Sequence, residues 1–421
     1  MGGLDGLDWW LGGPNPCCWA SEHPRCDRGA EAAQGTARRV VPLVAGCAAL
    51  CQQSKGMTSV RPPCLPVLTR IDWANRVSTE IEAVDLFCGA GGLTCGLRRG
   101  GIRVGVGVDL DETCRYPLEK NNPGTRFVQG DVARLQPRDV AAWFGKRTVR
   151  VLAGCAPCQP FSKYAVRDGE DKRWRLLAAF LRIVKGVRPE VVTMENVANL
   201  VRSNHPALPE FVSGLEGLGY STWVAVVDTS AVGVPQTRER VVLLAGADGQ
   251  RISFVPPRRK MLATVRTAIG HLPAIAAGDP PPADDPLHIS PKLSALNLKR
   301  IRATPEGGSW HDWPAGLRLA CHQTEAGRYY GSVYGRMAWD ELGPTITTQC
   351  YGYGNGRFGH PTQDRAVSLR EAALLQTFPS KYTFSAPGDR VTFRHVGRHI
   401  GNAVPPALGR AIARSIKQSF A

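Results

Sequence analysis

Apolar and polar positions follow two different periods along residues 81–249. Short apolar runs typical of buried strands recur between segments with the spacing of a helix. The predicted strands are 81–87, 103–108, 126–128, 149–153, 191–194, 222–227 and 240–245, and the predicted helices are a short one ending at 97, then 172–185 and 208–218. Repeated strand–helix units of this length predict an α/β fold whose sheet has a parallel core and helices on both faces.

Residues 1–80 show neither period over a useful length and are rich in Gly, Pro, Ala and Cys. We expect this segment to be disordered or poorly packed, with Met57 as an alternative start of translation. The apolar run 40–50 after Arg38 and Arg39 resembles an export signal, but it is too short to span a bilayer and begins well inside the chain. The cysteines of this segment lack the paired spacing of a zinc site, so we expect no metal ion.

Residues 250–365 have no strand–helix alternation. Prolines punctuate them, and scattered glycines and aromatic residues predict a smaller, irregular domain beside a catalytic domain at 81–249. Two basic clusters, Arg258-Arg259-Lys260 and Lys299-Arg300-x-Arg302, lie near aromatic residues in this region. A solvated surface explains most charge runs, but their gathering in an irregular lobe favours a binding surface.

Residues 366–421 return to a helical pattern. One helix has Ser368 as its cap and Glu371 at its third position, which completes a capping box. The last helix begins near Pro405 and runs through Ile416, because prolines are tolerated in a first turn. We expect these C-terminal helices to pack back on the sheet of the catalytic domain.

The charge of the chain indicates what kind of partner it binds. The 421 residues carry a formal net charge of +16, with a pI near 9.5, which indicates a polyanionic partner such as nucleic acid. Residues 1–80 hold 8 basic and 7 acidic side chains, so the excess lies in the folded part. The 13 cysteines follow no disulfide framework in so long a chain, which favours a reducing, cytoplasmic location.

Ligand-like groups stand at the ends of three successive predicted strands. The loop 87–92 is glycine-rich between a strand and a helix and suits a nucleotide-type cofactor. Thr94 stands where the G-x-G-x-x-G pattern needs its third glycine, which weakens an NAD interpretation. Asp109 ends the second strand, where an acidic side chain commonly holds ribose hydroxyls, and Asp131 ends the third. The crevice outside these strand ends is therefore the predicted binding site.

A thiol and a carboxylate lie at the next two strand ends. Cys158 follows the fourth strand in a proline-flanked loop, and Glu195 ends the fifth. Alternate residues of an extended segment face one way, so we expect Gln236, Arg238 and Arg240 to point together. Structural explanations stay open, namely a capping role for the glutamate and a surface stripe for the arginines. The C-x-x-C spacing that ends at Cys158 also fits a thiol oxidoreductase.

Six motifs follow one another in a recognisable order. They are Phe87-x-Gly89-x-Gly91, Pro157-Cys158-Gln159, Glu195-Asn196-Val197, Gln236-x-Arg238-x-Arg240, the run 370–379 and the run 401–406. Over residues 81–420 this set resembles the DNA (cytosine-5)-methyltransferases, with Ala156 in place of a frequent proline. The resemblance implies a Rossmann-like, S-adenosylmethionine-dependent methyltransferase sheet, a target-recognition domain at 250–365, S-adenosylmethionine as cofactor and double-stranded DNA as partner.

The resemblance also implies roles for the reacting groups. Cys158 would add to carbon 6 of a cytosine flipped out of the duplex, which makes carbon 5 nucleophilic enough to take a methyl group. Glu195 would hold the ring through N3 and the exocyclic amine and supply a proton at N3. Arg240 would bind the O2 oxygen, with Arg238 supporting its loop. Cys155 is left as a packing residue at the strand end.

Two further sets of contacts are implied by the resemblance. The cofactor contacts are Phe87, Gly89, Gly91, Leu93, Asp109, Asp131, Pro157, Asn402 and Val404. The DNA contacts are Gln159, Ser162, Gln236, Thr347 and Thr348. We expect a monomer on DNA, in a restriction-modification system with a cognate endonuclease or as a solitary methylase, and no membrane association. The alternatives are an RNA cytosine-5 methyltransferase, whose Cys-Phe-Thr signature is not found here, and a catalytically inactive DNA-binding relative.

Overall fold

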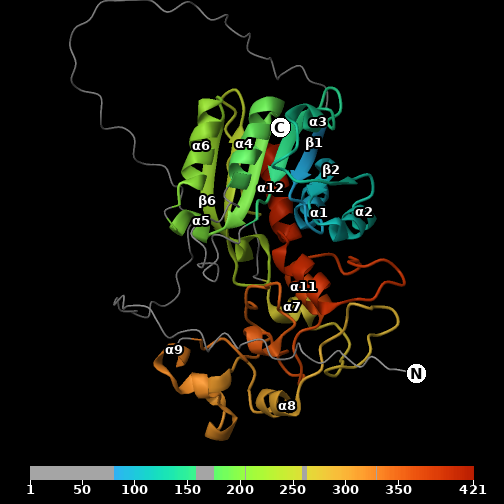
Figure 1. The fold of residues 1–421 in the computed structure, drawn as a ribbon, viewed down its shortest axis with the longest axis vertical. Coiled ribbons are helices and arrows are strands. Elements are labelled where there is room, and N and C mark those ends of the chain that lie inside the picture. The colour runs from blue at the N-terminus through green and yellow to red at the C-terminus, as the bar shows by residue number, and fades with distance from the viewer. Residues whose placement is uncertain (1–79, 158–174, 204, 258–262, 329) are drawn as a thin grey trace, which may run out of the picture. The chain divides into compact units, whose positions relative to one another are not determined.

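The computed structural model of the chain describes residues 80–157, 175–203, 205–257, 263–328 and 330–421 (Figure 1). These residues fall into two compact units. The sheet unit contains the described residues up to Asp228, together with 239–256 and Gly409–Ala421. The loop-rich unit contains Thr229–Arg238 and Pro257–Leu408. The grouping differs from the expected boundary at 366, because residues 366–408 belong to the loop-rich unit and the chain returns to the sheet unit at Gly409.

Seven strands form one mixed sheet in the order β3-β2-β1-β4-β5-β7-β6. They are β1 Ile81–Leu86, β2 Arg103–Asp109, β3 Arg126–Gln129, β4 Val149–Gly154, β5 Val191–Val197, β6 Ser221–Asp228 and β7 Glu239–Gly246. The first five strands pair in parallel, and β7 runs antiparallel to both β5 and β6. The strand order reverses between β1 and β4, which in open α/β sheets is where a ligand crevice forms. The predicted parallel-core α/β class is therefore confirmed.

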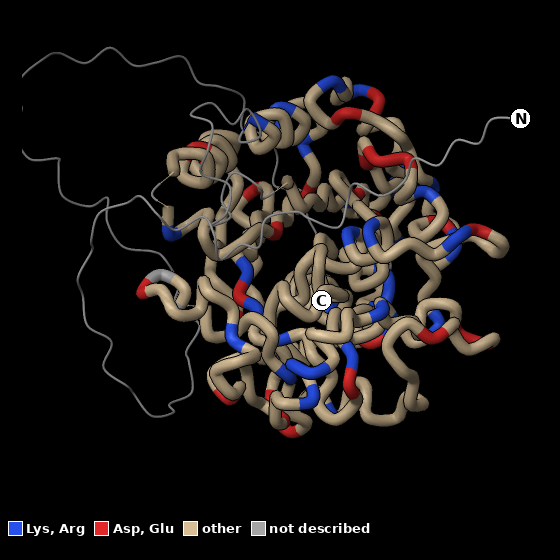
Figure 2. The backbone as a smooth tube through the Cα atoms, turned by 60° about the horizontal axis from the view of Figure 1, so that its bottom comes forward, with Lys and Arg blue, Asp and Glu red and all other residues tan. Residues whose placement is uncertain are grey.

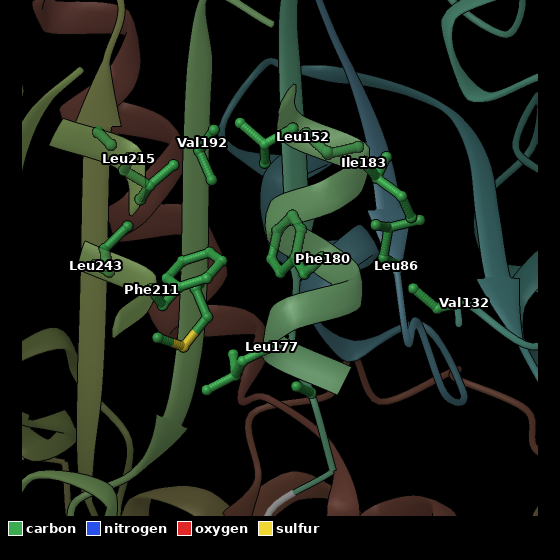
Figure 3. Close-up of a cluster of buried hydrophobic side chains, with 14 of the residues drawn as sticks. Leu86, Val132, Leu152, Leu177, Phe180, Ile183, Val192, Phe211, Leu215 and Leu243 are labelled. Carbon is green, nitrogen blue, oxygen red and sulfur yellow. The ribbon is translucent and has the colours of Figure 1, made fainter. Parts of the chain in front are cut away.

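Helices cover both faces of the sheet. The sheet unit contains α1 Gly92–Arg99, α2 Arg115–Asn121, α3 Pro137–Ala141, α4 Arg175–Val187, α5 Asn199–Arg202, α6 Ala207–Gly217, the 3-10 turn η3 Glu112–Cys114 and most of α12 Pro406–Gln418. In Figure 3 α4 lies on one face and α12 passes behind the strands. The predicted start of α4 at 172 lies outside the described residues. None of the described helices combines the length and apolar content needed to cross a membrane.

The core of the sheet unit lies between the strands and two helices. Phe180 of α4 and Phe211 of α6 pack with ring centroids 5.4 Å apart, over strand residues such as Leu152, Val192 and Leu243 (Figure 3). All five side chains are buried. Burial of an aliphatic or aromatic side chain contributes roughly 1.5–3 kcal/mol, so this layer fixes the strands whose ends carry the polar groups.

The loop-rich unit has short helices and no strand of its own among the described residues. Its helices are α7 Val265–Ile269, α8 Ala295–Arg302, α9 Glu325–Arg328, α10 Leu369–Leu375 and α11 Phe393–Asn402, and its 3-10 turns are η6 Thr229–Val232, η7 Trp310–Asp312, η8 Ala315–Leu317, η9 Ala320–Gln323 and η10 Tyr353–Asn355. The predicted capping box of α10 is present, because the Ser368 hydroxyl accepts from the Glu371 N–H and the Glu371 carboxylate accepts from the Ser368 N–H. A cluster that includes Trp310, Trp313 and Tyr334 forms the unit's aromatic core.

Arginines support the interior of the loop-rich unit. Arg300, which the sequence placed in a basic binding cluster, is buried over the rings of Trp313 and Tyr334, with its Cζ 5.3 and 5.6 Å from their centroids. Its guanidinium donates to the carbonyl oxygen of Leu317. Arg300 therefore stabilises the fold, and its expected place on a binding surface is wrong. The other predicted basic cluster, 258–260, lies outside the described residues. Figure 2 shows basic and acidic positions interspersed along the described part of the chain.

Candidate active site

The glycine loop after β1 has a fixed, unusual backbone. Phe87 has a φ of 60°, and Gly89 and Gly91 have φ values of 51° and 87°. A left-handed phenylalanine costs on the order of 1 kcal/mol or more, so the surrounding structure must hold this turn in place. A Cβ added at Gly89 would meet no atom within 4 Å, which leaves open space beside the loop. Leu93, a predicted cofactor contact, has a buried side chain.

Asp109 ties the glycine loop to the end of β2. Its Oδ2 accepts a hydrogen bond from the Gly89 N–H at 2.8 Å, and its Oδ1 accepts one from the Asp111 N–H at 2.9 Å. Burial raises the pKa of the Asp109 carboxyl. The next side chain, Leu110, is 68% exposed, an apolar surface that the sequence analysis did not single out. Asp131 follows the end of β3, where its Oδ1 accepts from the Ala133 N–H at 2.9 Å.

Asp85 is a buried carboxyl that sequence reasoning missed. It lies in β1 with no exposed surface, and the Thr94 hydroxyl donates to its Oδ2 at 2.6 Å. Burial raises the pKa of Asp85 to about 7, and the nearby charge of Asp109 also raises it. Thr94, which replaces the third glycine of a dinucleotide site, therefore has a structural partner. The sequence did contain a signal for this residue, namely an aspartate inside the apolar run 83–87.

The chain leaves β4 through Cys155, Ala156 and Pro157. The Asn196 side chain donates to the carbonyl oxygen of Ala156 at 3.1 Å, and this bond fixes the start of the proline loop. Pro157 is exposed. The predicted nucleophile and the two predicted DNA contacts that follow lie outside the described residues; they are Cys158, Gln159 and Ser162.

Glu195 and Arg240 meet on neighbouring strands of the sheet. Glu195 lies in β5 and is 3% exposed. Arg240, in β7, pairs with Val197 in register and places its Nε 3.1 Å from Oε1 of Glu195. The Cys155 thiol donates to the other oxygen, Oε2, with Sγ at 2.9 Å. The role of Cys155 as a packing residue alone is therefore wrong, because it contacts the candidate catalytic carboxylate.

Gln236 and Arg238 belong to the loop-rich unit. Gln236 is fully buried; its amide donates to the Leu375 carbonyl at 2.8 Å, and its oxygen accepts from the Ile346 N–H at 2.9 Å. Arg238 donates to the carbonyls of Ile346 and Ala403, at 3.0 and 3.2 Å. Both side chains support the backbone of this unit, so a DNA contact by Gln236 would require breaking internal bonds.

The remaining predicted contacts divide by exposure. Thr347 is exposed and Thr348 is half-buried in the segment that Arg238 holds at Ile346. Asn402, at the end of α11, is exposed, and the nearby Val404 side chain is buried. The threonines and Asn402 are thus available to a ligand, whereas the Val404 side chain is part of the core.

Residues 81–418 match the family model described as C-5 cytosine-specific DNA methylase. The Type II methylase M.HgiDII of Herpetosiphon aurantiacus is 46% identical over 318 residues, which is 75% of this chain and 89% of the relative. The Type II methyltransferase M1.HphI of Haemophilus parahaemolyticus is 31% identical over 309 residues, or 72% and 79% of the two chains. The solved structure of a prophage-encoded DNA modification methyltransferase from E. coli matches with a TM-score of 0.63 and 21% identity, over 80% of this chain and 99% of that one.

The sheet order, the glycine loop and the carboxylates at successive strand ends define a Rossmann-like fold. The family match covers most of the chain. The chain belongs to the C-5 cytosine-specific DNA methylases, and it is a DNA cytosine-5-methyltransferase.

Proposed function

We propose that this enzyme transfers a methyl group from S-adenosylmethionine to carbon 5 of a flipped-out cytosine in a specific duplex DNA sequence, through a covalent adduct with Cys158. The observation that carries the proposal is the buried Glu195–Arg240 pair at the carboxyl edge of the sheet. It stands next to the strand end from which the chain continues toward Cys158. The family match over 81–418 supports the same chemistry.

The residues at the ends of β1, β2 and β3 fit S-adenosylmethionine, which supplies an electrophilic methyl group when bound. The open space at Gly89 would let the backbone approach the cofactor. Asp109, held by two backbone N–H groups, would accept hydrogen bonds from the ribose hydroxyls, and Asp131 would contact the base. Leu110, which is 68% exposed, would offer an apolar surface to the adenine ring.

The protein groups drive the reaction at the cytosine. The Cys158 thiolate forms a bond to carbon 6, the electron pair of the C5–C6 double bond moves toward carbon 5, and Glu195 gives a proton to N3. Carbon 5 then takes the methyl group as the bond from this group to the sulfonium sulfur breaks, which would leave S-adenosylhomocysteine. Loss of the carbon 5 proton to a base, with departure of the thiolate, restores the double bond. N3 returns its proton to Glu195, and 5-methylcytosine is freed. Arg240 would stabilise the ring through O2 while charge builds on it.

The loop-rich unit would hold the DNA. Extruding the target base costs on the order of a few kcal/mol, which contacts elsewhere on the duplex must offset. Thr347 and Thr348 are suited to this task because Arg238 fixes the backbone at Ile346 beside them. Gln159 and Ser162 would add contacts near the nucleophile. The names of the relatives, a Type II methylase and a Type II methyltransferase, support a place in a restriction-modification system. A cognate endonuclease acting on the same site would be the partner in such a system.

Incubation of unmethylated duplex DNA with methyl-labelled S-adenosylmethionine tests the proposal. The wild type should produce 5-methylcytosine, measured after digestion to nucleosides, and Cys158→Ser should lose this activity while it still binds DNA. A serine variant that methylates at the wild-type rate contradicts the covalent mechanism. A parallel reaction with RNA separates the substrates: product in RNA and none in DNA contradicts a DNA substrate.

A further inference from the structure

We propose that Cys155 is a positioning residue for Glu195, whose thiol fixes the orientation of the carboxylate toward the target cytosine. The inference rests on the proposed function, because Glu195 is a catalytic residue only if this enzyme adds Cys158 to cytosine. It assigns a task to the first cysteine of the C-x-x-C pair that is distinct from that of the second.

The two side chains meet because their strands are neighbours in register. Gly154 at the end of β4 pairs with Met194 of β5, so the next residues, Cys155 and Glu195, follow side by side. The Sγ atom lies 2.9 Å from Oε2 of Glu195, and the carboxylate is 3% exposed. The register of β4 and β5 thus sets this contact, because Cys155 directly follows β4 and Glu195 lies within β5.

Arg240 contributes differently from the thiol. Its Nε lies 3.1 Å from Oε1, close enough for an ion pair, yet Oε1 makes no hydrogen bond of acceptable geometry to any residue that the structure describes. An ion pair depends mainly on distance, whereas a hydrogen bond also depends on angle. The arginine therefore supplies charge, and the thiol supplies the directional contact that fixes the carboxylate plane. Oε1 is left with lone pairs for an incoming donor.

Loss of the thiol should affect the chemical step more than binding. Without the Cys155 donor, the Glu195 carboxylate keeps its charge partner but can turn about its terminal bond, so it is misaligned with N3 in part of the population. The lost stabilisation falls on the transition state, which lowers kcat by about tenfold and leaves the KM for DNA and cofactor within about twofold.

Three single variants test this. Cys155→Ala removes the donor, Cys155→Ser keeps a donor of similar size, and Cys95→Ala is the control for loss of a buried thiol elsewhere in the sheet unit. We expect kcat to fall about tenfold in Cys155→Ala and to recover at least threefold in Cys155→Ser, with no change in Cys95→Ala. Thermal unfolding checks that all three variants are folded. A Cys155→Ala enzyme with wild-type kcat overturns the proposal, and so does a folded serine variant that is no better than the alanine variant.

A double-mutant cycle with Glu195→Gln shows whether Cys155 acts through the carboxylate. Single-turnover methyl transfer and covalent trapping on DNA that contains 5-fluorocytosine are measured for all four proteins. If the thiol works by orienting Glu195, Cys155→Ala slows both readouts in the wild-type background and changes neither by more than twofold in Glu195→Gln. Equal losses in both backgrounds overturn the proposal. A wild type that forms no 5-methylcytosine would instead refute the proposed function, and that result is seen before any variant is compared.

Discussion

One buried arginine of the loop-rich unit and two buried carboxyl groups of the sheet unit are held in opposite ways. In the loop-rich unit, the guanidinium of Arg336 is 5% exposed and donates to the carbonyls of Ile301, Thr304 and His360. In the sheet unit, Glu195 and Asp85 are at least as buried, yet Oε1 of the first and Oδ1 of the second have no hydrogen-bond partner among the described residues. Because an unsatisfied buried polar atom costs free energy, the difference separates charges that stabilise the fold from charges that are held ready for a ligand or a proton.

The architecture of each unit explains the contrast. Irregular chain leaves backbone carbonyls without the partners that a helix or sheet provides, and these carbonyls must be satisfied when they are buried. Arg336 and Arg365 do this in the loop-rich unit; Arg365 also pairs with Glu371 through both carboxylate oxygens, at 2.7 and 2.6 Å. In the sheet, the ladder satisfies the backbone, so polar side chains at the strand ends are free to serve the site.

The largest effect that we expect is on stability, from Arg336→Met. The change keeps much of the side chain's volume but removes donors from several buried carbonyls and leaves Asp364 without its buried partner. Breaking such an arrangement costs about 3–5 kcal/mol in the free energy of unfolding. Urea unfolding followed by tryptophan fluorescence measures it, because Trp310 and Trp313 lie in the core of the same unit.

Arg302→Met is the matched control for Arg336→Met. Arg302 also pairs with Asp364, at 3.1 Å, but its side chain is 64% exposed. Exposed ion pairs contribute about 0–1 kcal/mol, so this variant should unfold close to the wild type. If the two arginine variants lose equal stability, buried hydrogen bonding does not distinguish them, and the contrast between the units fails.

The sequence predicted more of the sheet unit than of the loop-rich unit, and the architecture of the two units explains this too. Valine-rich runs specify buried parallel strands, and topology then brings strand ends together, so Asp109 and Glu195 could be placed at strand ends without coordinates. The same alternation rule did not extend to Gln236 and Arg238. These residues precede β7 and pack within the loop-rich unit, because the chain changes units at Glu239. Periodicity carries no information on such a crossing.

Burial was the other quantity that the sequence did not reveal. The cluster at 299–302 has the composition of a binding surface, yet Arg300 is covered by two aromatic rings. Cys155 lies three residues from the proposed nucleophile and was predicted to be a packing residue, yet strand register places it against Glu195. Both cases depend on contacts between residues far apart in the chain, which local patterns cannot encode.

A second prediction sharpens the contrast within the sheet unit. Glu195→Gln should lower kcat by at least about 100-fold, because the amide cannot supply the proton at N3. It should change the free energy of unfolding by less than Arg336→Met does. Methyl transfer at saturating DNA and cofactor, together with urea unfolding, measures both quantities.

Glu82→Gln provides the control, since Glu82 is a carboxylate at the opposite ends of the strands. It is 1% exposed, pairs with Arg103 at 2.6 Å and accepts from the Gly145 N–H at 2.7 Å. Both of its oxygens are engaged, so the substitution should reduce stability and leave kcat within about twofold. If Glu82→Gln lost as much kcat as Glu195→Gln, the presence of partners on both carboxylate oxygens would not distinguish a structural carboxylate from a catalytic one.

The smallest effect that we expect is a change in the pH dependence of stability, from Asp85→Asn. Burial is the main cause that raises the pKa of Asp85 from 3.8 to about 7. Below pH 3.8 both the folded and the unfolded chain hold the proton, and the contribution of Asp85 to stability is complete. As the pH rises to about 7, the unfolded chain has released this proton while the folded chain retains it, so the free energy of unfolding falls.

Asparagine carries no titrating proton and can still accept the hydrogen bond from Thr94. The free energy of unfolding of the variant should therefore rise relative to that of the wild type by about 1–3 kcal/mol between pH 5 and pH 7. Above the pKa this difference should stay constant. Urea unfolding of both proteins at half-unit pH steps measures the difference. A difference that stays constant from pH 5 to pH 8 would show that Asp85 does not titrate in this window, and its unsatisfied oxygen would then have to be explained by a bound partner rather than by a retained proton.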